Sequence, residues 1–388
     1  MIHRPQAAKS RGMMAYTDSH IQTSASLPPP SVRGICSLMI CLLIVGGCQN
    51  RELRRDSPDI SVRHEYQHPA MGTRFRIVVL SQPGSNPEDA VKRAFERIDQ
   101  IERVASDWNP ESEVRTWCRS APHREAIVVS SDLATLLKSS LRIHDQTQGR
   151  FDITLGALTR LWRRCFRAER LPSQEDLELA YSQRGIDSIE VAGRKARLSK
   201  AGVSVDLGGI AKGYAVDEAL QLLDEFGFIH CLVDGGGDLA FGPAWPGSSG
   251  WVVRLPSGVH RFYSPGAVAT SGDSARYIEI DSARFSHILN PKTGLGLRNS
   301  PWVTVYAEDA TTADAFATAY SVPGPLPEES DLGSTGFPRA IQIIDPNTAE
   351  VKRWGRFPGR WPIPSGAGTG EGNPPSVPLG FPRAPESD

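Results

Sequence analysis

The amino-acid sequence predicts an α+β protein with a single large folded unit in the middle of the chain. Apolar residues at helical spacing alternate with short apolar runs typical of strands, yet no strict strand–helix–strand repeat persists. The chain has 388 residues, which is enough for a substantial core. Its 30 prolines and 36 glycines gather partly near the two ends, which indicates flexible extremities around a globular middle.

The elements expected in this middle follow from periodicity and from capping signals. Asn86-Pro87, Ser131-Asp132 and Pro172-Ser173 each place a capping residue or a proline where a helix begins. Predicted helices begin near residues 86, 131, 155, 173, 210 and 311. Predicted strands cover residues 73–80, 186–191, 195–198, 203–205, 228–233, 251–255, 267–270, 277–280, 302–306 and 340–344.

Charge and cysteine usage exclude several classes of function. The formal net charge is −1 and 22% of residues are charged, so the chain has no electrostatic footprint for nucleic acid. Three of the six cysteines lie in the first 48 residues, and the other three show no C-x-x-C or regular spacing. This argues against a zinc site and against a disulfide framework, and we interpret Cys118, Cys165 and Cys231 as small apolar fillers.

Residues 1–47 are interpreted as a leader. An apolar run begins at Ile35, is too short to cross a bilayer comfortably and ends in small residues, as signal peptides do. Val45-Gly46-Gly47-Cys48 resembles a bacterial lipobox, which implies that Cys48 is lipidated and anchors the protein to a membrane on the periplasmic or extracytoplasmic side. The alternative is an uncleaved membrane anchor. We expect a tether at 48–64, the folded domain at 65–354 and a disordered tail at 355–388.

One stretch, residues 203–217, has the pattern of a ligand-binding turn. A short apolar strand is expected to end at Asp206, followed by Gly208-Gly209 and a helix that begins near Lys212. Adjacent glycines let the backbone approach a ligand closely, and a helix N-terminus offers unpaired N–H groups to an anion. An acid before the glycines and a lysine after them suit a phosphate-bearing, metal-assisted ligand. The alternative is an ordinary tight turn between a strand and a helix.

Asp314 and Thr318 stand four residues apart on a predicted helix of small apolar residues and therefore share one face. A carboxylate and a hydroxyl are hard oxygen ligands of the kind that Mg²⁺ accepts. In the alternative interpretation, Asp314 interacts with the helix dipole and Thr318 bonds back to a carbonyl.

His287 precedes a Pro291–Gly294 turn and so lies at a strand end, where sites are commonly built. A histidine beside apolar residues is also often a purely structural side chain. The glycine run at 234–238 does not fit the dinucleotide-binding pattern, and the P-loop and nucleophile-elbow patterns are absent from the sequence.

Several short motifs together carry a family resemblance. They are Met71-Gly72-Thr73, Ser106–Ser112 with Trp108, Gly149–Asp152, Asp206–Tyr214, Gly236-Gly237-Asp238, Thr270–Asp273, Ser286–Ile288 with Pro291–Gly294, and Ala313–Thr318. In this order, over roughly residues 65–350, the series resembles the FAD:protein FMN transferase (ApbE-like flavin transferase) family, in which membrane-anchored lipoproteins are common.

The resemblance implies a Mg²⁺-dependent transfer of FMN from FAD to a Thr or Ser hydroxyl of an acceptor flavoprotein, with release of AMP. It implies Asp314, Thr318 and the Gly209 carbonyl as metal ligands, and His287 as the base or hydroxyl-orienting group. The residues implied to contact FAD are Met71, Trp108, Arg150, Phe151, Asp152, Asp206, Lys212 and Ile288.

Two departures from the family pattern are visible. Arg150 stands where a small residue is frequent and could alter contacts on the adenine side, and Trp108 replaces a more usual tyrosine while keeping a ring for stacking. A second hypothesis remains open, because the same residues suit a flavin-binding lipoprotein or an enzyme that only hydrolyses FAD to FMN and AMP.

Overall fold

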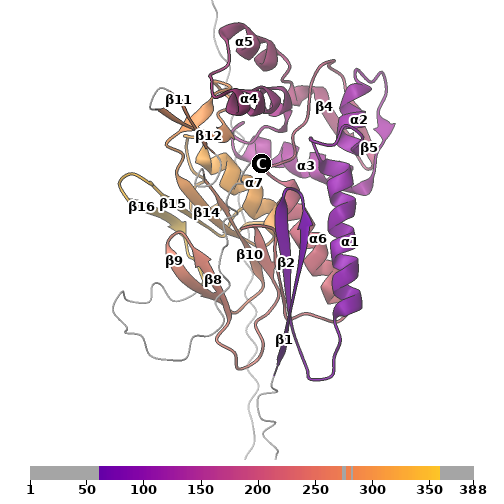
Figure 1. The fold of residues 1–388 in the computed structure, drawn as a ribbon, viewed down its shortest axis with the longest axis vertical. Helices are drawn as coiled ribbons and strands as arrows, with labels where there is room; N and C mark the ends of the chain where they lie inside the picture. The colour runs from indigo at the N-terminus through magenta and orange to yellow at the C-terminus, as the bar shows by residue number, and fades with distance from the viewer. Residues whose placement is uncertain (1–60, 273–276, 281–282, 359–388) are drawn as a thin grey trace, which may run out of the picture. The chain divides into compact units, whose positions relative to one another are not determined.

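An antiparallel sheet of eight strands forms the centre of the computed structural model, which describes residues 61–272, 277–280 and 283–358 (Figure 1). Neighbouring strands in this sheet are antiparallel throughout. In spatial order they are β1 (Val62–Ala70), β2 (Thr73–Ser81), β6 (Cys231–Asp234), β7 (Leu239–Phe241), β10 (Gly266–Ser271), β14 (Trp302–Ala307), β15 (Ala340–Ile344) and β16 (Val351–Gly355). All described residues belong to one compact unit of the chain, Asp56–Asp388.

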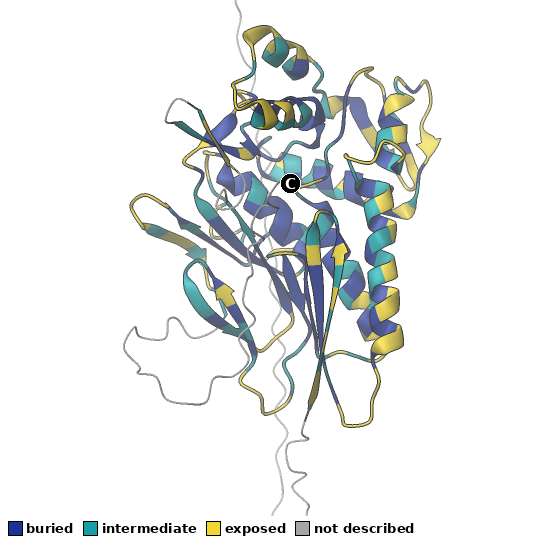
Figure 2. Cartoon of the chain, viewed as in Figure 1, coloured by how far each residue is buried: buried dark blue, intermediate teal, exposed yellow. Residues whose placement is uncertain are grey.

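The two faces of the sheet bury different sets of side chains, because successive residues of a strand point to opposite faces. Ile77, Val233 and Val305 pack into the main core under the helices. Val78 and Tyr306, each next to a member of that set in sequence, pack on the other face, under the hairpin of β8 (Trp251–Leu255) and β9 (Gly258–Phe262). The central strands are accordingly buried on both sides (Figure 2).

Three helices cover one face of the sheet. They are α1 (Glu88–Ala105), α6 (Ala211–Glu225) and α7 (Ala310–Ser321). Helix α7 packs on β10 and β14, α6 packs on β6, β7 and α7, and α1 packs on α6. A Cβ added to Gly213 would lie 2.2 Å from the Ala310 carbonyl oxygen, so only glycine permits this approach of α6 to α7.

The remaining elements gather mainly around the upper end of the sheet in Figure 1. The helical ones are α2 (Glu113–Arg119), α3 (Ser131–Gln146), the 3₁₀ turn η1 (Ile153–Leu155), α4 (Gly156–Ala168), α5 (Gln174–Ser182) and the 3₁₀ turn η2 (Ile186–Ser188). The strands are β3 (Ile127–Val128), β4 (Ile189–Ala192) and β5 (Lys195–Leu198) in one small sheet, and β11 (Tyr277–Ile280), β12 (Ala283–Leu289) and β13 (Gly296–Arg298) in another. Phe285 and Leu289 of β12 pack with Trp162 of α4 in a separate apolar cluster.

The predicted α+β class is confirmed, but two predicted strands differ from the structure. Residues 186–188 of the strand predicted at 186–191 form the 3₁₀ turn η2, and β4 begins at Ile189. Residues 203–205, also predicted as a strand, belong to no strand. Instead the Gly156 N–H donates to the Ser204 carbonyl at 3.0 Å, and the Asp206 N–H donates to the Ile153 carbonyl at 2.8 Å. The apolar alternation of Val203 and Val205 therefore reflects burial against the start of α4 rather than membership of a sheet.

The predicted leader, Cys48 and nearly all of the predicted tether and tail lie outside the described residues. Strand β1 begins at Val62, three residues before the predicted domain boundary, and β16 ends at Gly355. Within the described ranges, no helix is long and apolar enough to cross a membrane.

His260 of β9 should make stability fall on acidification. Burial, followed by the charge of Arg353, lowers the pKa of this histidine to about 4, whereas an unfolded histidine titrates near 6.5. The unfolded chain therefore takes up a proton first, so stability is complete above pH 6.5 and is lost as the pH falls towards 4. Urea unfolding at pH 7.5 and pH 5 should show a loss of about 2 kcal/mol from this group.

The variant His260→Gln keeps a polar side chain beside the Ser257 hydroxyl but does not titrate. Its unfolding free energy should change less between the two pH values. The same pH dependence in both proteins would exclude His260 as the origin.

Candidate active site

The side chain of Asp206 stabilises the loop before α6 by accepting a hydrogen bond from the loop backbone. The Gly208 N–H donates to Asp206 Oδ1 at 2.8 Å. Leu207 and Ile210 are fully buried and anchor the loop, while Gly208 is exposed and Gly209 is partly exposed. The glycine backbone at the start of α6 therefore faces outward from a rigid base.

Gly209 and Thr318 come from distant parts of the chain and lie against each other. A Cβ added to Gly209 would be 3.2 Å from Thr318 Oγ1 and 3.2 Å from Phe151 Cε2. Thr318 is one of only two residues of α7 that are not fully buried. The structure therefore brings together Gly209, Phe151 and Thr318, three residues that the sequence placed in one site.

Asp314 is buried and faces the start of α6. Its Oδ2 accepts a hydrogen bond from the Gly213 N–H at 3.2 Å and lies 3.4 Å from Lys212 Nζ. The first turn of α7 contains no acid, and Asp309 caps the helix by accepting from the Thr312 N–H at 2.7 Å. The position of Asp314 is therefore not that of a helix-dipole partner in the first turn, and its contacts are with the other half of the site.

Lys212 joins two buried carboxylates. Its ammonium group forms an ion pair with Asp238 as well as with Asp314. Burial opposes the charge on Lys212, but attraction to Asp238 and Asp314 outweighs it and raises the lysine pKa above its ordinary value. With both carboxylates ionised the cluster carries a charge of −1, which favours a further cation. Burial, followed by repulsion from Asp314, raises the pKa of Asp238 to about 7.

The loop after β6 leads to Asp238, which forms the ion pair with Lys212. Asp234 Oδ1 accepts from the N–H groups of Gly236 and Gly237 at 2.9 Å each, and Oδ2 accepts from Arg76 at 2.9 Å. A Cβ added to Gly236 would lie 2.2 Å from Thr73 Oγ1. This close approach puts the turn containing Met71, whose φ is +50°, beside the same loop.

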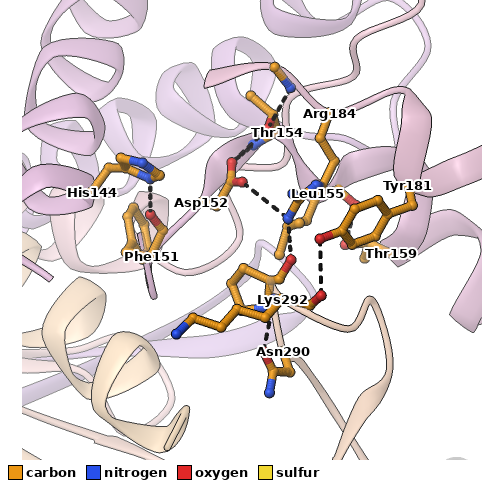
Figure 3. Close-up of polar contacts among 12 residues, drawn as sticks. His144, Phe151, Asp152, Thr154, Leu155, Thr159, Tyr181, Arg184, Asn290 and Lys292 are labelled. Carbon is orange, nitrogen blue, oxygen red and sulfur yellow. Dashed lines mark hydrogen bonds and ion pairs between the residues drawn. The ribbon is translucent and has the colours of Figure 1, made fainter. Parts of the chain in front are cut away.

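The Gly149–Asp152 turn is linked through Arg184 to the turn that follows β12 (Figure 3). The carbonyl of Phe151 accepts from His144 Nδ1 at 2.7 Å, and Asp152 Oδ1 accepts from the Thr154 N–H at 2.7 Å. Asp152 Oδ2 lies 3.9 Å from the guanidinium of Arg184, which also donates to the carbonyl of Pro291. The turn after β12 is therefore held against the predicted FAD-contacting turn.

His287 and Ile288 are adjacent on β12 but differ in environment. The His287 side chain is exposed. Ile288 is buried with Leu297 of β13 and Val322, the residue that follows α7. This contact ties β12 to the end of the helix that carries Asp314 and Thr318, while leaving the imidazole accessible from solvent.

Arg150 is enclosed by protein. Its Nε donates to the Thr147 carbonyl at 3.0 Å, and its guanidinium lies 4.8 Å from the centre of the Tyr320 ring. Burial lowers the pKa of this guanidinium below its ordinary value. The side chain therefore supports the end of α7, and we expect residue 150 to meet a ligand through its main chain.

Trp108 is 68% exposed and is connected to Asp206 through an arginine. The guanidinium of Arg163 lies 4.0 Å from the centre of the Trp108 ring, pairs with Asp107 and is 3.9 Å from Asp206 Oδ2. The cation–π contact with Arg163 restrains the exposed Trp108 ring, and such a ring can stack on a planar ligand.

Sequence reasoning missed three positioning residues. Arg163 holds Trp108 near Asp206, and Asp238 holds Lys212. Asp217 accepts from the N–H groups of Ala310 and Thr311 at 2.7 and 2.8 Å and from the Thr311 hydroxyl at 2.6 Å. An acid directly after a glycine run was a visible signal for Asp238, whereas the other two depend on tertiary contacts that sequence spacing does not encode.

Comparison with known proteins identifies the class of protein to which this chain belongs. An FAD:protein FMN transferase of Chlamydia muridarum is 32% identical over 296 residues, which are 73% of this chain and 88% of that protein. One of Vibrio cholerae is 30% identical over 270 residues, which are 66% of this chain and 80% of that protein. The structure of the ApbE protein of Thermotoga maritima, 32% identical, superposes with a TM-score of 0.66 and covers 76% of this chain and 97% of its own. The flavin transferase ApbE of Vibrio cholerae, 25% identical, has the same TM-score and the same coverage of both chains.

These relatives and the geometry of the site identify an enzyme of the flavin transferase class. The chain matches the ApbE family over residues 71–330 and belongs to that family.

Removing the Asp217 carboxylate should destabilise the junction of α6 and α7. Asp217→Ala leaves the first N–H groups of α7 without this acceptor, and loss of a helix cap costs about 2 kcal/mol. Asp224→Ala changes an exposed acid on the same helix and should stay within about 0.5 kcal/mol of the wild type in urea unfolding. Equal unfolding free energies for the two variants would rule out the capping role.

Proposed function

We propose that this enzyme transfers FMN from FAD to a Thr or Ser hydroxyl of an acceptor protein, with release of AMP, and that it needs Mg²⁺. The relatives are FAD:protein FMN transferases, which supports FAD as the donor and a protein as the acceptor. The observation that carries the proposal is the junction of α6 and α7, where Gly209, Lys212, Asp314 and Thr318 meet.

The residues at this junction fit a magnesium ion. Asp314, the Thr318 hydroxyl and the Gly209 carbonyl are hard oxygen donors, and the negative charge of the cluster favours a divalent cation. Among the described residues no group of three His, Cys, Asp or Glu side chains could hold a metal, so the hydroxyl and carbonyl oxygens are needed. When bound, the ion supplies neutralisation of the charge that develops as a pyrophosphate breaks.

The chain's own groups bind and orient the donor. The exposed backbone of Gly208 and Gly209 at the start of α6 suits a pyrophosphate oxygen, and Lys212 adds a positive charge held in place by Asp238. Trp108 stacks on a ring of the donor, and Asp206 contacts FAD beside it. Three surrounding segments complete the proposed donor site. They contribute the side chains of Met71, Phe151, Asp152 and Ile288, and residue 150 contributes its main chain.

His287 acts on the acceptor. An imidazole nitrogen takes the proton of the attacking hydroxyl, whose oxygen bonds to the phosphorus on the FMN side. The bond from that phosphorus to the bridging oxygen of the pyrophosphate breaks, and the bridging oxygen leaves as part of AMP. Its exposure on β12 supports this role, because a protein hydroxyl must reach it from outside. His287→Ala should slow transfer while FAD still binds, and a loss of FAD affinity equal to the loss of rate would make it a binding residue instead.

One experiment tests the reaction. The full chain, purified in detergent, is incubated with FAD, Mg²⁺ and a peptide that carries a threonine, and peptide-bound flavin fluorescence and AMP are measured. Labelled peptide with an equal amount of AMP is the expected result. Free FMN without label would indicate hydrolysis, and bound FAD without turnover would indicate a flavin-binding protein.

Asp314→Ala should abolish Mg²⁺-dependent turnover without unfolding the protein. The change removes a metal ligand but leaves Lys212 paired with Asp238, so no buried charge is left alone. We expect turnover to fall about 100-fold or more, with an unchanged circular dichroism spectrum, and Asp224→Ala to behave as the wild type. Full activity of Asp314→Ala at every Mg²⁺ concentration would exclude Asp314 as a metal ligand.

We also propose that Cys48 is lipidated and anchors the enzyme to a membrane on its extracytoplasmic side. The lipobox-like Val45–Cys48 after an apolar run supports this anchor. Cys48→Ser should move the protein from the membrane fraction to the soluble fraction after cell lysis. A protein that stays in the membrane fraction would support an uncleaved anchor instead.

A further inference from the structure

Two arginines from different helices converge on one neutral hydroxyl. Arg115 of α2 donates through Nη1 to Ser204 Oγ at 3.1 Å, and Arg160 of α4 donates through Nη1 to the same oxygen. The two donor nitrogens share one acceptor, so they lie within two hydrogen-bond lengths, about 6 Å, of each other. Both arginine side chains are partly exposed, whereas Ser204 is buried.

The charges around this pair are incompletely balanced. The nearby acids are Asp107 and Asp206, and each of them forms its ion pair with Arg163. In the part of the chain that the structure describes, neither Arg115 nor Arg160 forms an ion pair with a carboxylate. Burial, followed by the charge of Arg115, lowers the pKa of Arg160, and attraction to Asp107 and Asp206 offsets this only in part.

The chemistry of the pair indicates its ligand. Guanidinium groups are planar forks that match the oxygens of phosphate, and two forks whose donor nitrogens lie within about 6 Å of each other can contact one phosphate group from two sides. A serine hydroxyl neutralises neither charge, so a solvent-borne oxyanion would gain from both.

We propose that Arg115 and Arg160 form a phosphate-binding site beside the predicted donor site. Ser204 precedes Asp206 by two residues, and Arg163 lies one helical turn after Arg160 on the same face of α4. The phosphate is either inorganic or the phosphate of a nucleotide such as AMP. Only the mention of AMP rests on the proposed function, because phosphate binding does not require flavin transfer.

Calorimetric titration of the full chain without FAD or Mg²⁺ tests the site at fixed ionic strength. Inorganic phosphate and AMP should bind, and adenosine should not. Stronger binding of AMP than of phosphate would identify a nucleotide as the source, and equal binding would identify free phosphate. Because no flavin is present, the outcome is independent of whether the chain transfers FMN.

Arg115→Gln and Arg160→Gln should each raise the dissociation constant for phosphate about tenfold, as expected for loss of a charge-assisted hydrogen bond. Arg119→Gln on α2 and Arg164→Gln on α4 change exposed arginines of the same helices and should stay within twofold. Lysine at position 115 or 160 should restore part of the affinity.

Ser204→Ala separates ligand binding from a structural role. If the arginines bind phosphate, removing the hydroxyl should leave the dissociation constant within about threefold. If the arginines only hold the Val203–Leu207 segment, Ser204→Ala should raise the dissociation constant for phosphate as much as Arg160→Gln does. That result would show that the proposal is wrong. Absence of phosphate binding would also overturn it, as would loss of binding in Lys212→Met together with full binding in both arginine variants.

Discussion

The close contact of α6 with α7 is the constraint on which the rest of the site depends. Gly213 admits the backbone of Ala310, and Asp217 accepts the first N–H groups of α7, so the two helices are fixed in both separation and rotation. This fixed geometry puts Asp314 next to Lys212. A larger residue at 213 would separate the two halves of the site before it disturbed either helix alone.

Electrostatic balance differs between neighbouring parts of the protein. Around Lys212 the buried carboxylates outnumber the ammonium group, whereas around Ser204 the guanidinium groups outnumber their carboxylate partners. The first environment suits a cation and the second an anion, and the loop that carries Asp206 runs from one to the other. A donor with phosphates and a divalent ion would therefore meet complementary charge along one short segment of backbone.

The sequence predicted most of the regular elements and the shared face of Asp314 and Thr318, because periodicity is a local property. The strands predicted at 251–255 and 340–344 coincide with β8 and β15. Strand β1 was not predicted, and its first three residues were assigned to the tether, because its side chains are mostly exposed or half-buried, as suits an edge strand. Strand β7 is too short to show a period. The pairing of Lys212 with Asp238 could not be predicted, since it depends on the order of strands in the sheet.

The contact between Gly213 and Asp314 spans 101 residues of sequence. Long-range contacts of this kind form late, because the entropy of closing the intervening loop must be overcome first. Between the two halves the chain must also complete β6, β7, β10 and β14, against which α6 and α7 pack. The junction proposed to bind the donor is therefore complete only in the finished sheet, and a partly folded chain, however helical, would lack it.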